Sequence, residues 1–249
     1  MQTGKKIAVT GATGRLGRPL VELLEDAGHD VVPISRSNGV DVVTGDGLAD
    51  ALAGVEVIID AATGPSPDED EASRFFLASA HNLQTEGARA GVQRIVLVSI
   101  IGIDKFTAGY NVAKQKQERA HVDGPIPVTI LRAAQFHEFV GELMAWGTQG
   151  DVAYLWRMRT QLVAARSVAE ALVELAVAPD GADGAISEIG GPREEQLVDA
   201  AAKLAARRGG PERVEGIEPP DPQYLTGATL PGPGATLAGP TFEEWLAAA

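Results

Sequence analysis

The stretch VTGATGRLG, from Val9 to Gly17, lies near the start of this 249-residue chain. Its glycines, at positions 11, 14 and 17, follow the apolar run IAVT directly and precede RPLVELLEDAG directly. Glycines spaced in this way between a strand and a helix allow a tight turn, close approach of the backbone to a pyrophosphate, and close helix–strand packing. The free N–H groups and partial positive charge of the helix N-terminus also favour phosphate. The stretch therefore predicts a dinucleotide-binding turn rather than a bare connection.

Apolar runs of strand length alternate with longer runs of helical periodicity along the chain. The expected strands are β-branched and apolar on both faces, as in a parallel sheet that helices cover on both sides. This alternation predicts the α/β class, with a doubly wound parallel (Rossmann) sheet. We expect strands at 6–10, 30–34, 39–43, 55–61, 94–99, 127–132 and 185–190, and helices at 18–28, 47–54, 73–91, 111–122, 167–177 and 194–210.

The last third of the chain departs from this pattern. Residues 218–240 are rich in proline and glycine, and late segments of doubly wound folds often cover the edge of the sheet where ligands bind. We expect residues 1–134, completed by 161–190, to form the dinucleotide-binding core. Residues 135–160 and 191–249 are expected to form a small C-terminal substrate-side cap.

Composition excludes several function classes. The chain has no cysteine, which removes disulfides and thiolate chemistry, and its formal net charge of -13 opposes binding to a nucleic-acid backbone. The start of the chain lacks an apolar signal core, and no long apolar segment follows, so we expect a cytoplasmic protein that does not bind membranes. The four histidines are widely spread, so no metal is predicted. The expected state is a monomer or homodimer that acts on a small molecule.

The residues after the second expected strand indicate which dinucleotide is bound. A dinucleotide without the 2′-phosphate calls for an acid at this position, whereas a 2′-phosphate calls for arginine. This chain has Ser35, Arg36 and Ser37 there, and the next acid is Asp41. A guanidinium pairs well with phosphate, and Arg15 in the glycine turn is a second candidate for the same role. The pattern favours NADP(H).

Six stretches of the chain form a recognisable set: TGATGRLG, SRS, GD at 45–46, VSIIGID, YNVAK and LRAAQFHEF. In these stretches the chain resembles the short-chain dehydrogenase/reductase superfamily, and more narrowly its atypical, NmrA-like branch of NAD(P)-binding proteins. The resemblance covers roughly residues 5–190. It implies adenine contacts at Asp46 and Gly47, and ribose contacts at Ala61, Ala62 and Thr63. The cofactor-binding residues expected from the motifs and the resemblance are Gly11, Thr13, Gly14, Arg15, Leu16, Gly17, Arg36, Asp46, Gly47, Ala61, Ala62, Thr63 and Lys114.

Tyr110, Lys114 and Ser99 are the candidate catalytic residues. Tyr110 and Lys114 stand four residues apart on a predicted helix and so share one face, while Ser99 ends the fifth expected strand. The resemblance implies that Tyr110 donates the proton, that Ser99 holds the substrate oxygen, and that Lys114 also contacts the nicotinamide ribose. A nearby ammonium favours the phenolate, which is otherwise formed only near pH 10.

Three weaker candidates have ordinary structural explanations as well. Gln135 and His137 follow the sixth strand, and the resemblance places them beside the substrate, although a structural role for the histidine is equally consistent with the pattern. Asp60 is expected only to cap a turn. The acids of DEDEAS, 68–73, suit the start of a helix because of its dipole and do not indicate a metal site.

These observations together favour an NADPH-dependent oxidoreductase of the short-chain type, which reduces a small carbonyl, quinone or enone. Two alternatives stay open at this point. One is a non-catalytic, NADP(H)-binding redox-sensing regulator of the NmrA-like kind. The other is a redox-neutral isomerase or dehydratase that uses the same cofactor. A tyrosine with a lysine four residues later favours the enzyme, because a sensor needs no proton donor.

Overall fold

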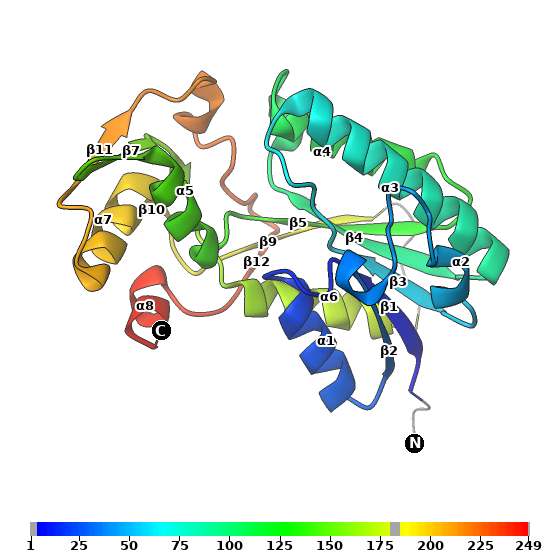
Figure 1. The fold of residues 1–249 in the computed structure, drawn as a ribbon. Helices are drawn as coiled ribbons and strands as arrows, with labels where there is room; N and C mark the ends of the chain where they lie inside the picture. Colours follow the sequence, from blue (N-terminus) through cyan, green and yellow to red (C-terminus); the bar gives the residue numbers. More distant parts are fainter. Residues whose placement is uncertain (1–3, 180–184, 249) are drawn as a thin grey trace. The chain divides into compact units, whose positions relative to one another are not determined.

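A computed structural model describes residues 4–179 and 185–248 of the chain. Strands and helices alternate through most of the chain, as expected (Figure 1). In chain order the elements are β1 (Lys6–Thr10), α1 (Gly17–Asp26), β2 (Asp30–Ile34), η1 (Arg36–Asn38), α2 (Leu48–Ala51), β3 (Val57–Asp60), α3 (Glu69–Ala90), β4 (Arg94–Ile100), η2 (Ile103–Lys105), α4 (Tyr110–Val122), β5 (Val128–Ala133), η3 (His137–Phe139), α5 (Val140–Gly147), β6 (Thr148–Gln149), β7 (Val152–Trp156), β8 (Arg159–Thr160), α6 (Ala165–Val177), β9 (Ile186–Gly190), β10 (Glu195–Gln196), α7 (Leu197–Arg208), β11 (Arg213–Ile217), η4 (Pro222–Tyr224), β12 (Thr236–Leu237) and α8 (Phe242–Ala248).

The main sheet confirms the predicted doubly wound, Rossmann-like class. Its seven strands run in the order β12-β9-β5-β4-β3-β1-β2, and β1 pairs in parallel with β2 on one side and with β3 on the other. The chain therefore builds the sheet outward from β1 in both directions. Thr10, the last residue of β1, lies opposite Ile34 of β2 and Asp60 of β3. In open sheets of this kind, ligands bind at the carboxyl ends of the strands where the order reverses.

Helices cover both faces of this sheet. In Figure 1, α3 and α4 lie on one face and α1 and α6 on the other. The apolar core beneath α2 and α3 includes Ile58 and Ile95, both fully buried. Helix α3 begins at Glu69, four residues earlier than expected, because the Asp68 carboxylate accepts the N–H groups of Asp70 and Glu71. The acids of DEDEAS thus begin this helix, which agrees with their structural interpretation.

The strand expected at 39–43 does not exist, and this prediction is wrong. Asp41 folds the segment into turns instead: its Oδ1 accepts the N–H of Val43 at 2.7 Å, and its carbonyl accepts the N–H of Gly45 at 2.8 Å. Only Val42 of the apolar residues is buried, while Val43 is 37% exposed. Asx turns of this kind compete with strand pairing for the backbone hydrogen-bonding groups. Among the described residues, no strand therefore pairs with β2 on its outer side, and β2 is one of the two edge strands of the sheet, with β12 at the other edge.

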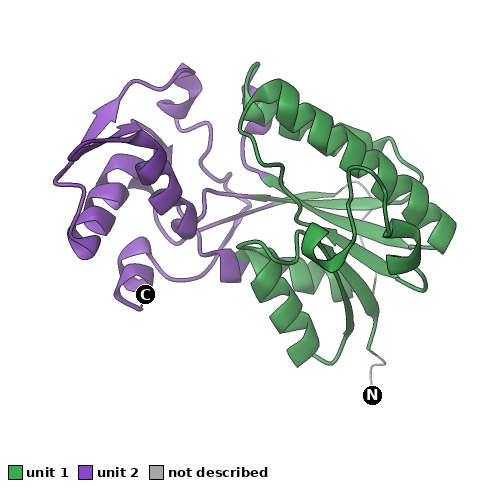
Figure 2. Cartoon of the chain, viewed as in Figure 1, with its two compact units in different colours: residues 1–99, 107–132, 168–187 green, residues 100–106, 133–167, 188–249 purple. Residues whose placement is uncertain are grey.

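The chain divides into two compact units, which Figure 2 shows in different colours. The first comprises residues 1–99, 107–132 and 168–187, and the second comprises 100–106, 133–167 and 188–249. The sequence places residues 100–106, 133–134, 161–167 and 188–190 in the core, whereas this division places them in the second unit. Within the second unit, β7 pairs in parallel with β11 and antiparallel with β6. Its apolar core includes residues of α5, β7, α7 and α8.

Candidate functional site

The glycine turn at the end of β1 has the geometry that its sequence predicts. Gly11 has a φ of 63°, and a Cβ there would lie 2.7 Å from the carbonyl oxygen of Ala61. A Cβ on Gly17, the first residue of α1, would collide with the carbonyl oxygen of Gly11. The first glycine therefore brings β1 close to the end of β3, and the third brings α1 close to the turn.

The middle of the turn is open. Thr13, Gly14 and Arg15 are exposed, and a Cβ on Gly14 would meet only the Gly11 carbonyl oxygen, at 3.0 Å. Leu16 is buried instead, so its side chain anchors the turn in the core. No side chain caps the N-terminus of α1, and its first turn has no acid. The partial positive charge of this helix end is therefore available to an anion.

Polar groups follow the end of β2, at the edge of the sheet. Arg36 begins the short η1 turn and is exposed. The hydroxyls of Ser35 and Ser37, which flank it, lie 2.8 Å apart and form a hydrogen bond. Asp46 is also exposed, in the loop that replaces the expected strand, and Gly47 next to it has a φ of 72° and directly precedes α2.

The residues after β3 are bonded to β1 and to α4. The N–H groups of Ala61 and Ala62 both donate to the Thr10 hydroxyl, at 3.1 Å. Thr63 is exposed, and its hydroxyl lies 3.0 Å from the hydroxyl of Tyr110. Sequence reasoning assigned Thr63 only to the cofactor, and nothing in the local pattern indicated that it would contact Tyr110, 47 residues away.

Tyr110 is the first residue of α4 and is partly buried. Its ring packs edge-on against Phe76 of α3, with 5.7 Å between centroids. Burial raises the pKa of the Tyr110 phenol above its ordinary value of 10.0, and the hydrogen bond with Thr63 offsets part of this effect. The phenol is therefore protonated at neutral pH, as a proton donor must be, rather than held as the phenolate that the sequence analysis considered.

Lys114 lies one turn further along α4 and is almost completely buried, with 5% exposure. Its ammonium donates to the Val98 carbonyl at 2.9 Å and to Gln117 Oε1 at 2.5 Å, and it lies 4.8 Å from the centre of the Phe76 ring. Burial lowers the pKa of Lys114 to about 8, although the charges of Asp60 and Glu118 oppose this effect. The expected ribose contact of Lys114 stays a prediction.

Ser99 lies near the carboxyl end of β4 and is buried. Its Oγ has no hydrogen-bond partner among the described residues. A buried hydroxyl without a partner is uncommon, because an unmade hydrogen bond costs about 1–3 kcal/mol. Ser99 therefore keeps a free polar group at the edge of the sheet where ligands bind in this fold.

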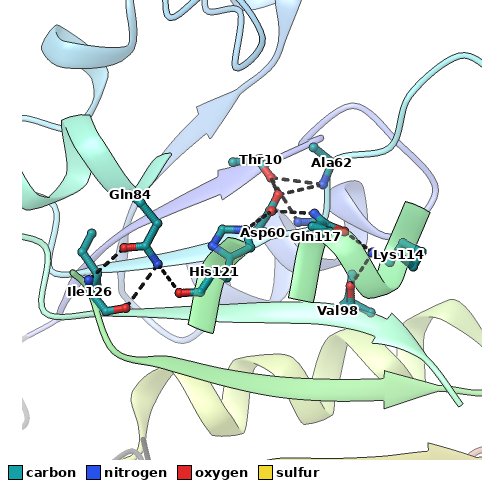
Figure 3. Close-up of polar contacts among 10 residues, drawn as sticks. Thr10, Asp60, Ala62, Gln84, Val98, Lys114, Gln117, His121 and Ile126 are labelled. Atoms are coloured by element: carbon teal, nitrogen blue, oxygen red, sulfur yellow. Dashed lines mark hydrogen bonds and ion pairs between the residues drawn. The ribbon is translucent and has the colours of Figure 1, made fainter. Parts of the chain in front are cut away.

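Asp60 is the functional candidate that sequence reasoning missed (Figure 3). It caps the turn after β3, as expected, by accepting the Ala62 N–H at 3.3 Å, but it is also almost fully buried and takes three further hydrogen bonds. Thr10 donates to its Oδ1 at 2.5 Å, and Gln117 and His121 contact its Oδ2 at 3.0 and 3.1 Å. A signal was present: an acid ends a fully apolar strand, and polar residues recur at 114, 117, 118 and 121 on one helix face.

These contacts decide the charge of Asp60. Burial alone would raise the pKa of its carboxyl, but the interaction with His121, the hydrogen bond from Thr10 and the charge of Lys114 outweigh burial and hold the pKa below 3.8. Asp60 is therefore a buried carboxylate with hydrogen-bond donors on both oxygens.

Gln135 and His137 belong to the second unit. The carbonyl of Gln135 accepts the N–H of Val163 at 3.0 Å. His137 is completely buried, with Nε2 at 3.1 Å from the Pro240 carbonyl and its ring packed against Phe242 and Trp245 of α8. Burial lowers the pKa of His137, so the imidazole is neutral. These contacts favour the structural role that the sequence left open for this histidine.

Comparison with known proteins agrees with the geometry of the glycine turn. The model of a family described as NAD(P)H-binding matches residues 11–179, from the first glycine of the turn to two residues beyond α6. The chain belongs to this NAD(P)H-binding family. The predicted resemblance to NAD(P)-binding proteins is thereby confirmed. Relatives of the chain include named dehydrogenases and reductases, and a protein named as a member of the short-chain dehydrogenase/reductase superfamily is among its structural neighbours.

Two curated relatives of this family member have assigned activities. An L-arabinose 1-dehydrogenase (NAD(P)(+)) of Haloferax volcanii is 31% identical over 117 residues, which is 43% of this chain and 44% of the dehydrogenase. A (4-alkanoyl-5-oxo-2,5-dihydrofuran-3-yl)methyl phosphate reductase of Streptomyces griseus is 26% identical over 84% of this chain and 76% of the reductase. The chain thus spans less than half of the first relative and about three quarters of the second.

Solved structures share the fold. A short-chain dehydrogenase/reductase superfamily protein of Agrobacterium tumefaciens, with NAD bound, superposes with a TM-score of 0.68 at 19% identity over 98% of this chain and 95% of that protein. Within the described ranges, no helix is long and apolar enough to cross a membrane. The same ranges contain no group of three or more His, Cys, Asp or Glu side chains arranged to hold a metal ion.

Proposed function

We propose that this protein is an NADPH-dependent reductase of a small carbonyl compound, quinone or enone, with Tyr110 as the proton donor. The observation that carries the proposal is the hydrogen bond of 3.0 Å between the hydroxyls of Tyr110 and Thr63, one turn of α4 before the buried ammonium of Lys114. The dehydrogenase and reductase activities of the named relatives support the reaction class.

The residues at the carboxyl end of the sheet fit a dinucleotide. Gly14 leaves space above the uncapped N-terminus of α1, where a pyrophosphate is favoured. The unpaired Ser99 hydroxyl supplies a free hydrogen-bonding group at the same edge. Asp46 and Gly47 would lie at the adenine, and Ala61, Ala62 and Thr63 at the ribose. When bound, this cofactor supplies the hydride.

The protein's own contribution is to place and deliver a proton. Hydride addition to a carbonyl carbon leaves negative charge on the oxygen, which takes the phenolic proton as the O–H bond of Tyr110 breaks. The raised pKa keeps that proton on Tyr110 until the oxygen becomes basic enough to accept it. Ser99 is proposed to hold the same oxygen with its free hydroxyl, and solvent then restores the proton of Tyr110.

We propose NADPH rather than NADH because Arg36 is exposed between two serine hydroxyls and the nearest acid in the sequence, Asp41, is committed to a turn. A guanidinium recognises phosphate through paired hydrogen bonds, so Arg36 would hold the 2′-phosphate. Titration of both dinucleotides into the wild type and into Arg36→Asp tests this choice. We expect the wild type to prefer NADPH and the variant to lose that preference. Equal binding of both dinucleotides by the wild type would refute it.

NADPH oxidation against a panel of ketones, aldehydes, quinones and enones tests the reaction. We expect turnover with at least one class, which Tyr110→Phe abolishes while NADPH still binds. Tyr154→Phe removes the same hydroxyl from β7 of the second unit and serves as the matched control. Turnover that survives in Tyr110→Phe removes Tyr110 from the chemistry. NADPH binding without oxidation across the whole panel would instead indicate the redox-sensing alternative.

A further inference from the structure

One face of α4 buries an unusual number of polar side chains. Lys114, Gln117, Glu118 and His121 are between 0% and 7% exposed, and they recur at helical spacing so that all four face inward. Burying polar and charged groups costs free energy unless each finds a partner. Helices of this kind normally present apolar residues to a sheet, so this face requires an explanation beyond packing.

Gln117 connects the two buried charges. Its Oε1 accepts from the Lys114 ammonium at 2.5 Å, and its Nε2 donates to Asp60 Oδ2 at 3.0 Å (Figure 3). The acceptor end of the amide thus meets the cation and the donor end meets the anion, which is the only orientation that satisfies both. Asp60 is fixed in turn by the Thr10 hydroxyl and by His121.

We propose that Gln117 and Asp60 are positioning residues, which act through Lys114 by holding its ammonium charged and fixed in direction. We call the series Lys114, Gln117 and Asp60 the α4 relay. The role of Lys114 in the reaction rests on the proposed function. The effect of Gln117 and Asp60 on the Lys114 ammonium does not, because it depends only on contacts within the chain. Thr10 directly precedes Gly11, so the Asp60 end of the relay lies at the base of the glycine turn.

The other groups that face Lys114 leave Asp60 as its main counter-charge. Glu118, on the same helix, is held by Arg132 in two hydrogen bonds of 2.8 and 3.0 Å. Helix α3 contributes the Phe76 ring, and β4 contributes the neutral carbonyl of Val98. His121 contacts the same oxygen of Asp60 as Gln117 does. Burial lowers the pKa of Lys114 to about 8, and the charge of Asp60 opposes a further fall.

NMR titration of isotope-labelled lysine side chains in the full chain without cofactor tests the relay directly. Lys114→Met assigns the Lys114 signal. Asp60→Asn removes the counter-charge, and Gln117→Met removes the bridging amide with little change in volume. Gln84→Met is the matched control, because Gln84 of α3 is also buried and bonded through its amide, to His121 and Ile126 backbone groups, without contacting Lys114.

We expect the Lys114 pKa to fall by about one pH unit in Asp60→Asn and in Gln117→Met, and to stay near its wild-type value in Gln84→Met. An unchanged pKa in the folded relay variants would overturn the proposal, as would an equal fall in the control. Circular dichroism establishes folding, and if Asp60→Asn does not fold, Gln117→Met decides alone. The titration needs no turnover, so it tests the relay separately from the proposed function. If the Lys114 pKa falls as expected but the protein has no reductase activity, only the proposed function is refuted.

Discussion

The buried ammonium of Lys114 predicts a specific dependence of stability on pH. The folded protein holds the Lys114 pKa at about 8, against 10.5 for an ordinary lysine, chiefly through burial. Between these values the unfolded chain binds the proton more strongly than the folded protein does, so stability rises with pH across this range. A fall of this size corresponds to about 3 kcal/mol in the free energy of unfolding. The protein is less stable by this amount below pH 8, and the loss disappears as the pH approaches 10.5.

Lys114→Met measures this contribution by difference. Denaturant unfolding of the wild type and the variant at a series of pH values gives two curves of unfolding free energy. We expect the wild type to gain about 2–3 kcal/mol relative to Lys114→Met between pH 7 and pH 10. Lys116→Met is the control, because Lys116 lies on the same helix with a side chain that is 40% exposed. Parallel curves for the wild type and Lys114→Met would refute the buried, destabilised ammonium.

The glycine turn and the Tyr110 hydrogen bond give three further predictions. We expect Gly17→Ala to destabilise the fold by about 1–3 kcal/mol, because its Cβ meets the Gly11 backbone. Gly14→Ala, whose Cβ would lie 3.0 Å from the Gly11 carbonyl oxygen, is expected to destabilise the fold less than Gly17→Ala does but to bind the dinucleotide at least about tenfold more weakly, a difference of about 1.4 kcal/mol. Equal binding in calorimetry would contradict the proposed pyrophosphate position. Thr63→Val removes one hydrogen bond to Tyr110, worth about 1 kcal/mol, so we expect reductase kcat at saturating NADPH to fall about fivefold. Unchanged turnover would show that Thr63 does not support the donor.

Local sequence signals were sufficient for much of the first unit. The runs at 6–10 and 30–34 are strands with the predicted bounds. Their apolar, β-branched composition can be recognised from the residues of each short segment alone. The glycine turn was also predictable from the sequence. A Cβ on any of its three glycines would approach a backbone atom of the turn itself or of the end of the neighbouring strand. The segment at 39–43 failed because the side chain of Asp41 forms a turn that the apolar pattern does not reveal.

Contacts between distant residues account for what the sequence did not show. Strands β7 and β11 pair although 152–156 and 213–217 are far apart in the chain, and neither was expected as a strand. In the same way, the residues next to Asp60 predict only that it caps a turn, and its contacts with Gln117 and His121 arise from the tertiary fold. Tyr110 and Lys114 were found from their spacing, but their partners Thr63 and Gln117 were not assigned to them.

The central claim is that this member of the NAD(P)H-binding family transfers hydride instead of only binding the dinucleotide. The most direct measurement uses NADPH deuterated at nicotinamide C4, incubated with the protein and the carbonyl and enone panel, followed by mass spectrometry of the products. For quinones, formation of the hydroquinone is measured instead, because deuterium on its hydroxyl groups exchanges with water. We predict a product that carries deuterium with the wild type and none with Tyr110→Phe, under conditions in which both bind NADPH. Saturating NADPH binding by the wild type, with no deuterium in any carbonyl or enone product and no hydroquinone formed, would contradict the account.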